Sequence, residues 1–423
     1  LHRVDRRQRQ MCIRDRRSTV ARHADLPTPS AFSTLFRLLG VALAVILVSS
    51  VAVAGFVAAD VLNRVGEGAV TLEDDVEVAP PSLGAYPSDK AFNLLIVGTD
   101  ECGEVSTKIL GDRCAQSEQG ALNDVTLLVH VSAAPRAVTV VSFPRDLGLE
   151  VPECEREDGS TASAMSKGRI NEVFEHAGVS CVAKTVTDLS GLPVEFAAKI
   201  SFDGVIAITD AIGGVDVCVA GEGIHDTLAG VDLPVGTHTV SGASALAFIR
   251  TRHGVGDGSD LARISNQQQY MSRLAKKILC AETLTDPSKV LRLMDTVADN
   301  IVPSESLSNA LTLTQLALAL KDVEFSDFVF VQYPNLTDPE DSDKVVPDYD
   351  AAAPLWAALI AGEPITLAGD VATHRSVELA TPPPVDEPVE TATEAPEARA
   401  TLPPEISGQT LDQETCSVGV QAE

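Results

Sequence analysis

The feature that most constrains the fold is a glycine-rich break between two helical patterns, within Phe248–Gln267. The residues before the break predict a short helix that carries Arg250 and Arg252 at its end, and three glycines between 254 and 258 then interrupt it. After the break, apolar residues recur at spacings of three, four and seven, which predicts a second, amphipathic helix that begins near Ser259 or Asp260. The chain therefore has to turn sharply here and present its arginines at the turn.

The polar face of the second helix suits an anionic ligand. At about 100° per residue, Asp260, Arg263 and Gln267 fall within roughly 60° of one another and can converge on one ligand. Planar guanidinium groups match phosphate oxygens in bidentate fashion, so this face, together with Arg250 and Arg252, favours a phosphate or diphosphate over a neutral substrate. The alternative is a solvated helix face with internal ion pairs.

A long uncharged run, Leu38–Ala59, precedes the rest of the chain. Arginines lie before it and carboxylates after it, and a span of about 20 apolar residues crosses a bilayer. We therefore expect a single transmembrane helix at 38–59, with the N-terminus inside and the remainder outside the plasma membrane. The alternative is a cleaved signal peptide at Ala52–Ala54, although the run exceeds the usual h-region.

Charge and cysteine content narrow the function classes. The 423 residues carry a formal net charge of −28, which argues against nucleic acid as a partner because duplex binding needs a basic surface. Eight cysteines are present, and an exported location permits disulfides. Their spacing lacks the paired CxxC pattern of a thiolate zinc site. We expect the pairs Cys102–Cys114 and Cys154–Cys181, because each brackets a loop.

Composition divides the chain into six parts, and helical patterns alternate with apolar strands in the largest one, which predicts a layered α/β/α fold with a central mixed β-sheet. The parts are a basic cytoplasmic tail (1–37), the transmembrane helix (38–59), an acidic extracellular stalk (60–90), the main domain (91–335, core 91–282), an acidic and irregular extension (336–379) and a disordered tail rich in Pro, Thr and Glu (380–423).

Polar residues also stand at the ends of predicted strands. Asp100 follows the apolar run 91–97, Asp124 begins the next run, and Arg145 comes directly after Pro144, which stops its strand. Two carboxylates suit Mg²⁺, which favours one or two protein carboxylates plus phosphate oxygens. The alternative for each aspartate is a cap or turn residue.

The order of these motifs resembles the LytR-CpsA-Psr family over about residues 91–282. The series that carries the resemblance is Asn93-Leu-Leu-Ile-Val-Gly-Thr-Asp100, Asn123-Asp124, Ser142-Phe-Pro-Arg-Asp146, Arg169-Ile-Asn171, Asp210-Ala-Ile-Gly-Gly-Val-Asp216, Gly242-Ala-Ser-Ala-Leu246, Arg250-Thr-Arg252, Asp260-Leu-Ala-Arg-Ile264 and Gln267.

The resemblance implies a membrane-anchored wall enzyme, a phosphotransferase that moves a glycopolymer from a polyprenyl diphosphate carrier to peptidoglycan. It implies that the lipid chain lies in an apolar tunnel and that a Mg²⁺-bound diphosphate sits at the mouth. The alternatives are a polyprenyl diphosphate pyrophosphatase and a non-catalytic protein that binds wall glycan or lipid for regulation.

Matched position by position, the resemblance assigns Asp100 and Asp124 to the metal and the remaining residues to the diphosphate and its chemistry. The catalytic set is Arg145, Arg250, Arg252, Asp260 and Arg263, and the diphosphate-binding set is Arg145, Arg169, Arg250, Arg252, Arg263 and Gln267. Three positions depart from the family pattern by lacking an arginine, namely Cys102, Leu122 and Asn266. Arg113 is a candidate replacement for one of these charges.

Overall fold

The computed structural model describes residues 31–66, 68–74, 76–82, 84–112, 114, 121–280, 287–371, 376–380 and 399–420. The chain divides into two compact units, Leu1–Ala59 and Asp60–Glu423. The predicted transmembrane segment 38–59 falls within helix α2 (Ala31–Gly66), and the side chains of 50–59 lie outside the described part. Among the residues that are described, no helix is both long and apolar enough to cross a membrane.

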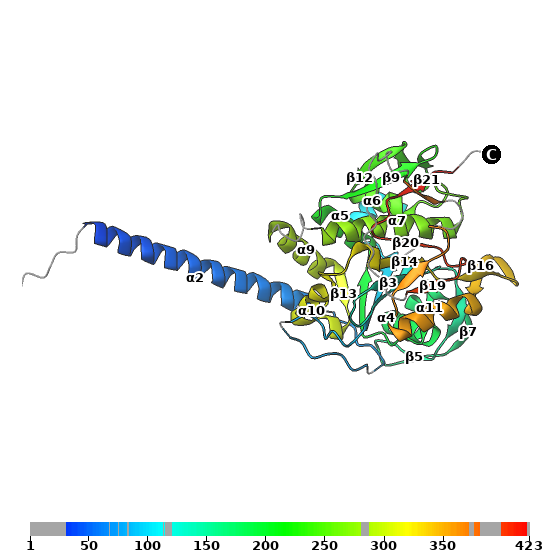
Figure 1. Cartoon of the computed structure of the whole chain (residues 1–423), viewed down its shortest axis with the longest axis horizontal. Helices are drawn as coiled ribbons and strands as arrows, with labels where there is room; N and C mark the ends of the chain where they lie inside the picture. The colour runs from blue at the N-terminus through cyan, green and yellow to red at the C-terminus, as the bar shows by residue number, and fades with distance from the viewer. Residues whose placement is uncertain are drawn as a thin grey trace, which may run out of the picture. The chain divides into compact units, whose positions relative to one another are not determined.

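A seven-stranded mixed sheet forms the centre of the second unit (Figure 1). Its order is β13-β8-β1-β2-β3-β14-β20, in which β1 runs parallel to β8 and β3 runs parallel to β14, whereas the other neighbours are antiparallel. The strands are β1 (Phe92–Thr99), β2 (Asn123–Val131), β3 (Val138–Phe143), β8 (Phe196–Ile200), β13 (Ile301–Pro303), β14 (Phe328–Gln332) and β20 (Gly408–Thr410). This confirms the predicted α/β fold with a central mixed sheet.

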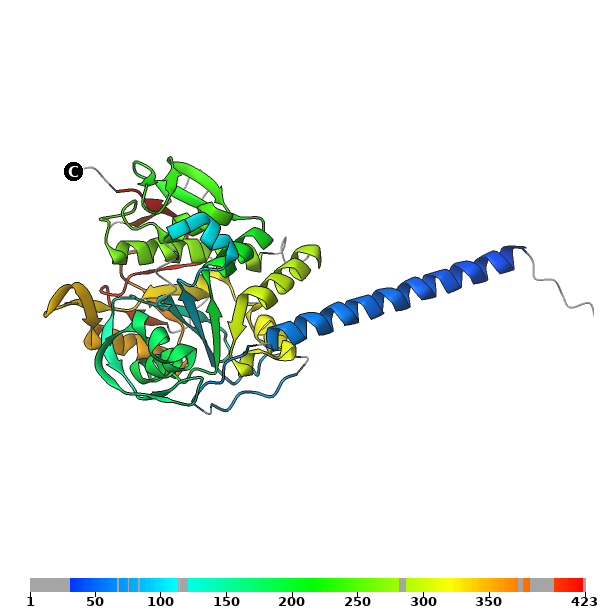
Figure 2. The ribbon, with the colours of Figure 1, turned by 180° about the vertical axis from the view of Figure 1, so that it is seen from behind.

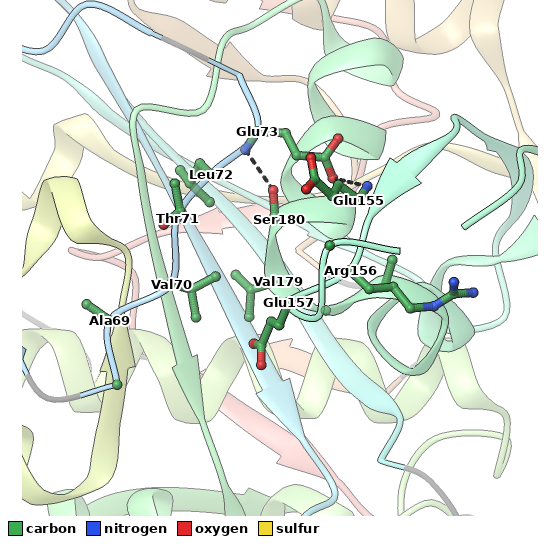
Figure 3. Close-up of a pocket in the computed structure, with 14 residues that line it drawn as sticks. Ala69, Val70, Thr71, Leu72, Glu73, Glu155, Arg156, Glu157, Val179 and Ser180 are labelled. Atoms are coloured by element: carbon green, nitrogen blue, oxygen red, sulfur yellow. Dashed lines mark hydrogen bonds between the residues drawn. The ribbon is translucent and has the colours of Figure 1, made fainter. Parts of the chain in front are cut away.

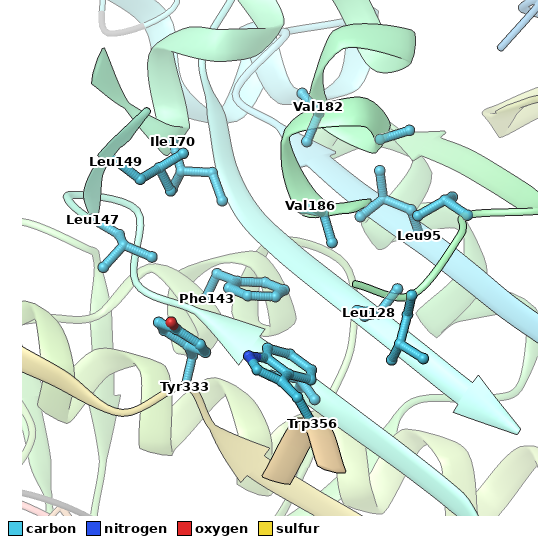
Figure 4. Close-up of a cluster of buried hydrophobic side chains, with 14 of the residues drawn as sticks. Leu95, Leu128, Phe143, Leu147, Leu149, Ile170, Val182, Val186, Tyr333 and Trp356 are labelled. Carbon is cyan, nitrogen blue, oxygen red and sulfur yellow. The ribbon is translucent and has the colours of Figure 1, made fainter. Parts of the chain in front are cut away.

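Helices cover both faces of this sheet because alternate strand residues are apolar on each side. One face packs against α4 (Val173–Ser190) and α11 (Tyr349–Ala361), where Phe143, Tyr333 and Trp356 lie against one another (Figure 4). The opposite face packs against α7 (Asp260–Leu279) and α10 (Ala310–Leu320) through Met271 and Leu316. The order of layers is therefore α/β/α.

A second, four-stranded sheet with the order β12-β9-β21-β18 lies beyond α7, so that this helix runs between the two sheets (Figures 1 and 2). Its strands are β9 (Val215–Ala220), β12 (Gly236–Val240), β18 (Val377–Leu379) and β21 (Thr415–Val418). Helix α6 (Gly242–Arg250) follows β12, and Ser241 is its N-cap residue. Tyr270 on α7 packs into the core of this sheet with Phe248 of α6.

The remaining elements connect these layers. They are α3 (Glu104–Leu110), β4 (Gly148–Val151), β5 (Cys154–Glu155), β6 (Thr161–Ala162), β7 (Met165–Arg169), η2 (Ile170–Glu172), α5 (Phe202–Ala211), β10 (Ile224–Asp226), β11 (Val231–Leu233), α9 (Pro287–Asn300), η3 (Glu305–Leu307), η4 (Phe325–Asp327), β15 (Asn335–Asp338), β16 (Asp341–Pro347), β17 (Ile365–Leu367) and β19 (Ala400–Leu402).

Two predicted parts, the stalk and the irregular extension, are more ordered than expected. In the predicted stalk 60–90, the Val70 amide donates to the Pro303 carbonyl at 2.9 Å and Tyr86 is buried, because short apolar stretches here pack on the body. The predicted irregular extension 336–379 contains the hairpin β15–β16 and the helix α11.

The prediction of a disordered tail over 380–423 is wrong for the residues described there. Residues 399–420 contribute strands to three sheets, and Leu402, Leu411 and Val418 are buried. The short apolar stretches between the polar ones are sufficient for strand pairing, and a disulfide adds a covalent tie. Residues 381–398 and 421–423 lie outside the described residues.

The described residues contain three disulfides. Cys102–Cys114 and Cys154–Cys181 confirm the two predicted pairs. The third, Cys218–Cys416, joins β9 to β21 over a sequence separation of 198, a distance that sequence spacing does not suggest. Cys12 lies outside the described residues.

Candidate functional site

The candidate site lies at one edge of the central sheet, where strand direction brings distant residues together. Strand β2 runs antiparallel to β1, so that Asn123 at the start of β2 pairs with Thr99 at the end of β1. Asp100 follows Thr99 and donates its amide to the Leu122 carbonyl at 3.1 Å, whereas Asp124 follows Asn123. The two carboxylates are close enough for the charge of Asp124 to act on Asp100. The Leu122 amide donates to Asp100 Oδ1 at 2.8 Å. Burial raises the pKa of Asp100 above its usual value, and the negative charge of Asp124 raises it further.

Arg145 connects three carboxylates at this edge. It follows Pro144 directly after β3, whose end lies beside the start of β2. Its guanidinium donates to Asp124 Oδ1 at 2.9 Å and lies 3.3 Å from Asp146 and 3.7 Å from Asp260. Burial alone would lower the pKa of Arg145, but the three acids outweigh it and raise the pKa above its usual value. The guanidinium is thus held cationic.

The first turn of α7 supplies the other side of this ion-pair network. Ser259 caps the helix by accepting a hydrogen bond from the Ala262 amide, as expected for a helix that begins at Asp260. Arg263 Nη2 lies 2.7 Å from Asp260 Oδ1, and both side chains are largely buried. Charged groups at this depth require partners, and Asp260 is placed between two arginines.

Arg169 joins the network at its periphery. It lies 3.7 Å from Asp146 Oδ1 and forms an ion pair with Glu172, which raises the pKa of Arg169. The structure therefore brings together the predicted residues Asp100, Asp124, Arg145, Arg169, Asp260 and Arg263.

The three other predicted residues lie at the α6–α7 junction. The Arg250 guanidinium stacks over the Phe202 ring at 5.2 Å, and Gln267 donates through Nε2 to the Ile249 carbonyl at 2.9 Å. Arg252 is exposed, and its Nε donates to the Gly258 carbonyl at 3.3 Å. In the described structure Arg252 is folded onto its own loop, without an ion pair to the carboxylates of the network.

An apolar cavity of about 100 Å³ adjoins Gln267. It lies between the central sheet and the helices α5 and α7, and Gln267 contributes to its wall. The other lining residues are Ile96, Gly98, Val125, Leu127, Ile200, Val205, Ile208, Ile249, Tyr270, Met271 and Leu274. Gln267 therefore belongs both to the wall of the cavity and to the α6–α7 junction that carries Arg250 and Arg252.

A larger cavity of about 690 Å³ lies elsewhere in the body, and Figure 3 shows its lining. Glu73, Glu155 and Glu157 contribute carboxylates to it, and Arg156 is its one basic residue. It contains none of the predicted residues, and its negative charge would repel a diphosphate. The smaller cavity is therefore the better candidate for a lipid diphosphate.

Sequence reasoning did not select several residues that the structure adds to the site. Asp146 lies in a quoted motif and binds both Arg145 and Arg169. Lys199 is the penultimate residue of β8, which pairs with β1, and it forms an ion pair with Glu101 at 2.8 Å. The available signal was positional, because Lys199 lies near the end of β8 and Glu101 lies two residues after the end of the parallel strand β1.

The three positions that lack the family arginine have structural roles here. Cys102 is disulfide-bonded, and buried Asn266 donates to the Phe248 carbonyl at 2.8 Å. The Leu122 amide donates to the Asp100 carboxylate, and the Leu122 carbonyl accepts a hydrogen bond from the Asp100 amide. Arg113, the candidate replacement, lies outside the described residues.

The donor set of Asp100 and Asp124 fits Mg²⁺. Within the described part of the chain, no group of three or more His, Cys, Asp or Glu side chains is suited to a metal ion. Two carboxylates are nevertheless what Mg²⁺ uses when a bound phosphate completes its octahedron. Burial, and then the charge of Asp124, raise the pKa of Asp100, and a nearby cation would favour its charged form.

The chain is similar in sequence to known proteins. The cell wall biosynthesis protein LcpA of Corynebacterium glutamicum is 30% identical over 249 residues, which cover 54% of this chain and 48% of LcpA. The polyisoprenyl-teichoic acid–peptidoglycan teichoic acid transferase TagT of Bacillus subtilis is 26% identical over 247 residues, covering 56% of this chain and 67% of TagT. The chain thus spans about half the length of LcpA.

Among solved structures, the LytR-Csp2A-Psr enzyme from Actinomyces oris has a TM-score of 0.49 and 22% identity, and the match covers 69% of this chain and 96% of that chain. The sequence profile of the LytR_cpsA_psr family matches residues 62–345, a span that includes the acidic and basic residues of the sheet edge and of the α6–α7 junction. Because this match extends over well more than half of the sequence, the chain belongs to the LytR_cpsA_psr family.

Proposed function

We propose that the protein is a phosphotransferase that moves a glycopolymer from a polyprenyl diphosphate carrier onto peptidoglycan during cell-wall assembly. The observation that carries this proposal is the position of the partly buried network Asp124–Arg145–Asp260–Arg263 near an apolar cavity. A polyprenyl diphosphate is a hydrocarbon joined to a strong anion, and this site offers a surface for each part.

The family supports the reaction class. TagT, a relative, carries the name of a polyisoprenyl-teichoic acid–peptidoglycan teichoic acid transferase, and LcpA carries that of a cell wall biosynthesis protein. We extend this chemistry to the present chain as a proposal, with peptidoglycan as the acceptor.

In the proposed reaction, a hydroxyl of the wall sugar attacks the phosphorus next to the glycan, and the bond from that phosphorus to the oxygen of the lipid phosphate breaks. Arg145 and Arg263 would hold the diphosphate oxygens and stabilise charge on the leaving phosphate. Asp260, placed between the two arginines, fixes their orientation and is a candidate acceptor for the hydroxyl proton. Arg169, Arg250, Arg252 and Gln267 would extend the contacts to the head group.

Asp100 and Asp124 are the residues that would hold Mg²⁺, which supplies charge neutralisation of the diphosphate when it is bound. Within the protein itself, Arg145 fixes the position of Asp124 through the 2.9 Å hydrogen bond, and the main chain of Leu122 fixes Asp100. The two carboxylates are therefore oriented before any ligand arrives.

We also propose that the domain faces the cell wall from a single anchor at 38–59. The support is the uncharged run with arginines before it, together with three disulfides in the described domain, which are typical of an oxidising compartment.

The test is an assay of the purified full-length chain in detergent with Mg²⁺, a polyprenyl diphosphate-linked glycan and a peptidoglycan oligosaccharide. Mass spectrometry should detect the glycan phosphate on the acceptor together with released polyprenyl phosphate. Polyprenyl phosphate without acceptor product would instead identify a pyrophosphatase. Saturable binding without turnover would identify a non-catalytic, regulatory protein.

A further inference from the structure

The loop between α6 and α7, residues 251–258, is held from two sides. On one side lies Asp226, which is buried at the end of β10. Its Oδ2 accepts hydrogen bonds from Thr251 Oγ1 at 2.8 Å and from the amides of Arg252 and His253 at 3.2 Å each. One carboxylate oxygen therefore fixes three consecutive residues of this loop, including the backbone of Arg252.

On the other side lies the C-terminal segment of the described chain. The Gly256 amide donates to the Val418 carbonyl at 3.0 Å, and the Val420 amide donates to the Gly254 carbonyl at 3.3 Å. Between these bonds, Val255 and Gly419 form an antiparallel bridge. The loop thus gains a short strand partner immediately after Arg252.

The same C-terminal segment also binds α7, the helix that carries Asp260, Arg263 and Gln267. Glu414 forms ion pairs with Arg273 and Lys276, and the Thr415 carbonyl accepts hydrogen bonds from Gln269 at 3.2 Å and from Arg273 at 2.9 Å. The segment lies well after residue 345, where the family match ends. An element outside the matched region therefore contacts both the arginine loop and the helix of the candidate site.

These contacts on two sides matter because the loop 251–258 is intrinsically flexible. Gly256 and Gly258 adopt φ values of +55° and +78°, in the region that other residues avoid, and glycine loses the most conformational freedom when it is ordered. Hydrogen bonds that order the loop in advance remove that entropy cost from ligand binding.

We infer that residues 414–420 and Asp226 together form a clamp that positions Arg252 for the diphosphate. These are positioning residues, since they act through the loop and do not touch the ligand. The inference rests on the proposed function for the identity of the ligand, whereas the order of the loop is independent of it.

Gly419 offers a selective way to open the clamp. A Cβ built at this residue would lie 1.7 Å from the Gly223 carbonyl oxygen, so that Gly419→Ala forces the segment away from its neighbours. Gly84→Ala is the matched control, because a Cβ there meets only Ser82 Oγ at 3.9 Å. Val420→Pro is a second variant, which removes the amide that donates to Gly254 and fixes φ at residue 420.

The first measurement is hydrogen–deuterium exchange without ligand, combined with thermal melting. We expect the amides of residues 254–258 to exchange about tenfold faster or more in Gly419→Ala and Val420→Pro than in the wild type, as in local opening. Exchange in the central sheet and in Gly84→Ala should be unchanged. Wild-type exchange of the loop in both folded variants would overturn the clamp.

The second measurement is a double-mutant cycle on the affinity for farnesyl diphosphate in the presence of Mg²⁺. Arg252→Ala should weaken binding about tenfold or more in the wild type, as expected for loss of a charged hydrogen bond, and clearly less in the Gly419→Ala background. Fully additive losses would contradict positioning of Arg252 by the clamp. If Arg252→Ala has no effect in the wild type, the proposed role of Arg252 in diphosphate binding fails, while the exchange experiment still decides whether the clamp orders the loop.

Discussion

Arg145 donates a hydrogen bond to Asp124 at 2.9 Å, although 21 positions separate the two residues in the sequence. The contact arises because β3 returns antiparallel to β2, which places the residue after Pro144 beside the first residues of β2. Asp260, on a helix more than a hundred residues later in the sequence, lies 3.7 Å from the same guanidinium. Arg145 is therefore the central cation of the candidate site.

The first prediction follows from this central position. Arg145→Gln should lower transfer or hydrolysis of a lipid diphosphate about 10²- to 10³-fold, as expected for the loss of one preorganised charged donor. Steady-state kinetics with a polyprenyl diphosphate-linked glycan measures the effect. Arg292→Gln, an exposed arginine on α9, is the matched control and should retain activity. Full activity of a folded Arg145→Gln variant would exclude a catalytic role for this residue.

The second prediction concerns metal linkage. If Asp100 and Asp124 hold Mg²⁺ against the diphosphate, Mg²⁺ should raise the affinity for farnesyl diphosphate, and the lipid should raise the affinity for Mg²⁺ by the same factor. Calorimetric titration with and without Mg²⁺ measures both affinities. A coupling of 1–3 kcal/mol, about 5- to 150-fold, is typical.

The matched variants separate a metal role from a general charge effect. Asp100→Asn and Asp124→Asn should each reduce the coupling, whereas Asp322→Asn, whose side chain is 83% exposed after α10, should not. Coupling of wild-type size in both site variants would make these aspartates structural turn residues.

Much of the fold and site could be predicted from local sequence. The strand that ends before Asp100, the stop at Pro144 and the helix start near Asp260 are each set by apolar runs, by proline and by capping chemistry within a few residues. The ordered motifs then pointed to a single family, and the family match agrees with that.

The rest depends on contacts between distant residues, which no local pattern contains. The partner of Cys218 lies 198 positions away, and the strand that contains Cys416 has only four residues within a polar tail. Nothing in the local sequence around Asp226 indicates that its carboxylate accepts a hydrogen bond from the Arg252 amide. Likewise, composition suggested disorder for the C-terminal tail, because the order of that segment comes from its contacts with distant strands.

The third prediction addresses the apolar cavity. Val205 on α5 lines it, and Val205→Phe would fill part of its volume of about 100 Å³. Affinity for farnesyl diphosphate should fall about tenfold or more, because exclusion of two methylene groups costs about 1.6 kcal/mol at about 0.8 kcal/mol each. Affinity for inorganic pyrophosphate should not change, since the head-group residues remain in place.

The control for this substitution is Val235→Phe, at a valine that is 58% exposed. Isothermal titration of both ligands against both variants gives the comparison. Equal losses for farnesyl diphosphate and pyrophosphate in Val205→Phe would indicate a distorted head-group site and would contradict a lipid role for the cavity.

The last prediction concerns a buried histidine outside the site. His130 on β2 is 3% exposed, its Nδ1 lies 2.8 Å from Asn93 Oδ1, and burial lowers its pKa to about 4 from an ordinary value of 6.5. Because the folded protein binds this proton less readily than the unfolded chain, stability is complete above pH 6.5 and decreases as the pH falls toward 4, by about 3 kcal/mol at most. The free energy of unfolding in urea, measured from about pH 7.5 down to about pH 4.5, should show this loss in the wild type. It should depend less on pH in His130→Gln. His238→Gln, at a partly exposed histidine on β12, should follow the wild-type profile. An unaltered slope in His130→Gln would assign the acid sensitivity to other groups.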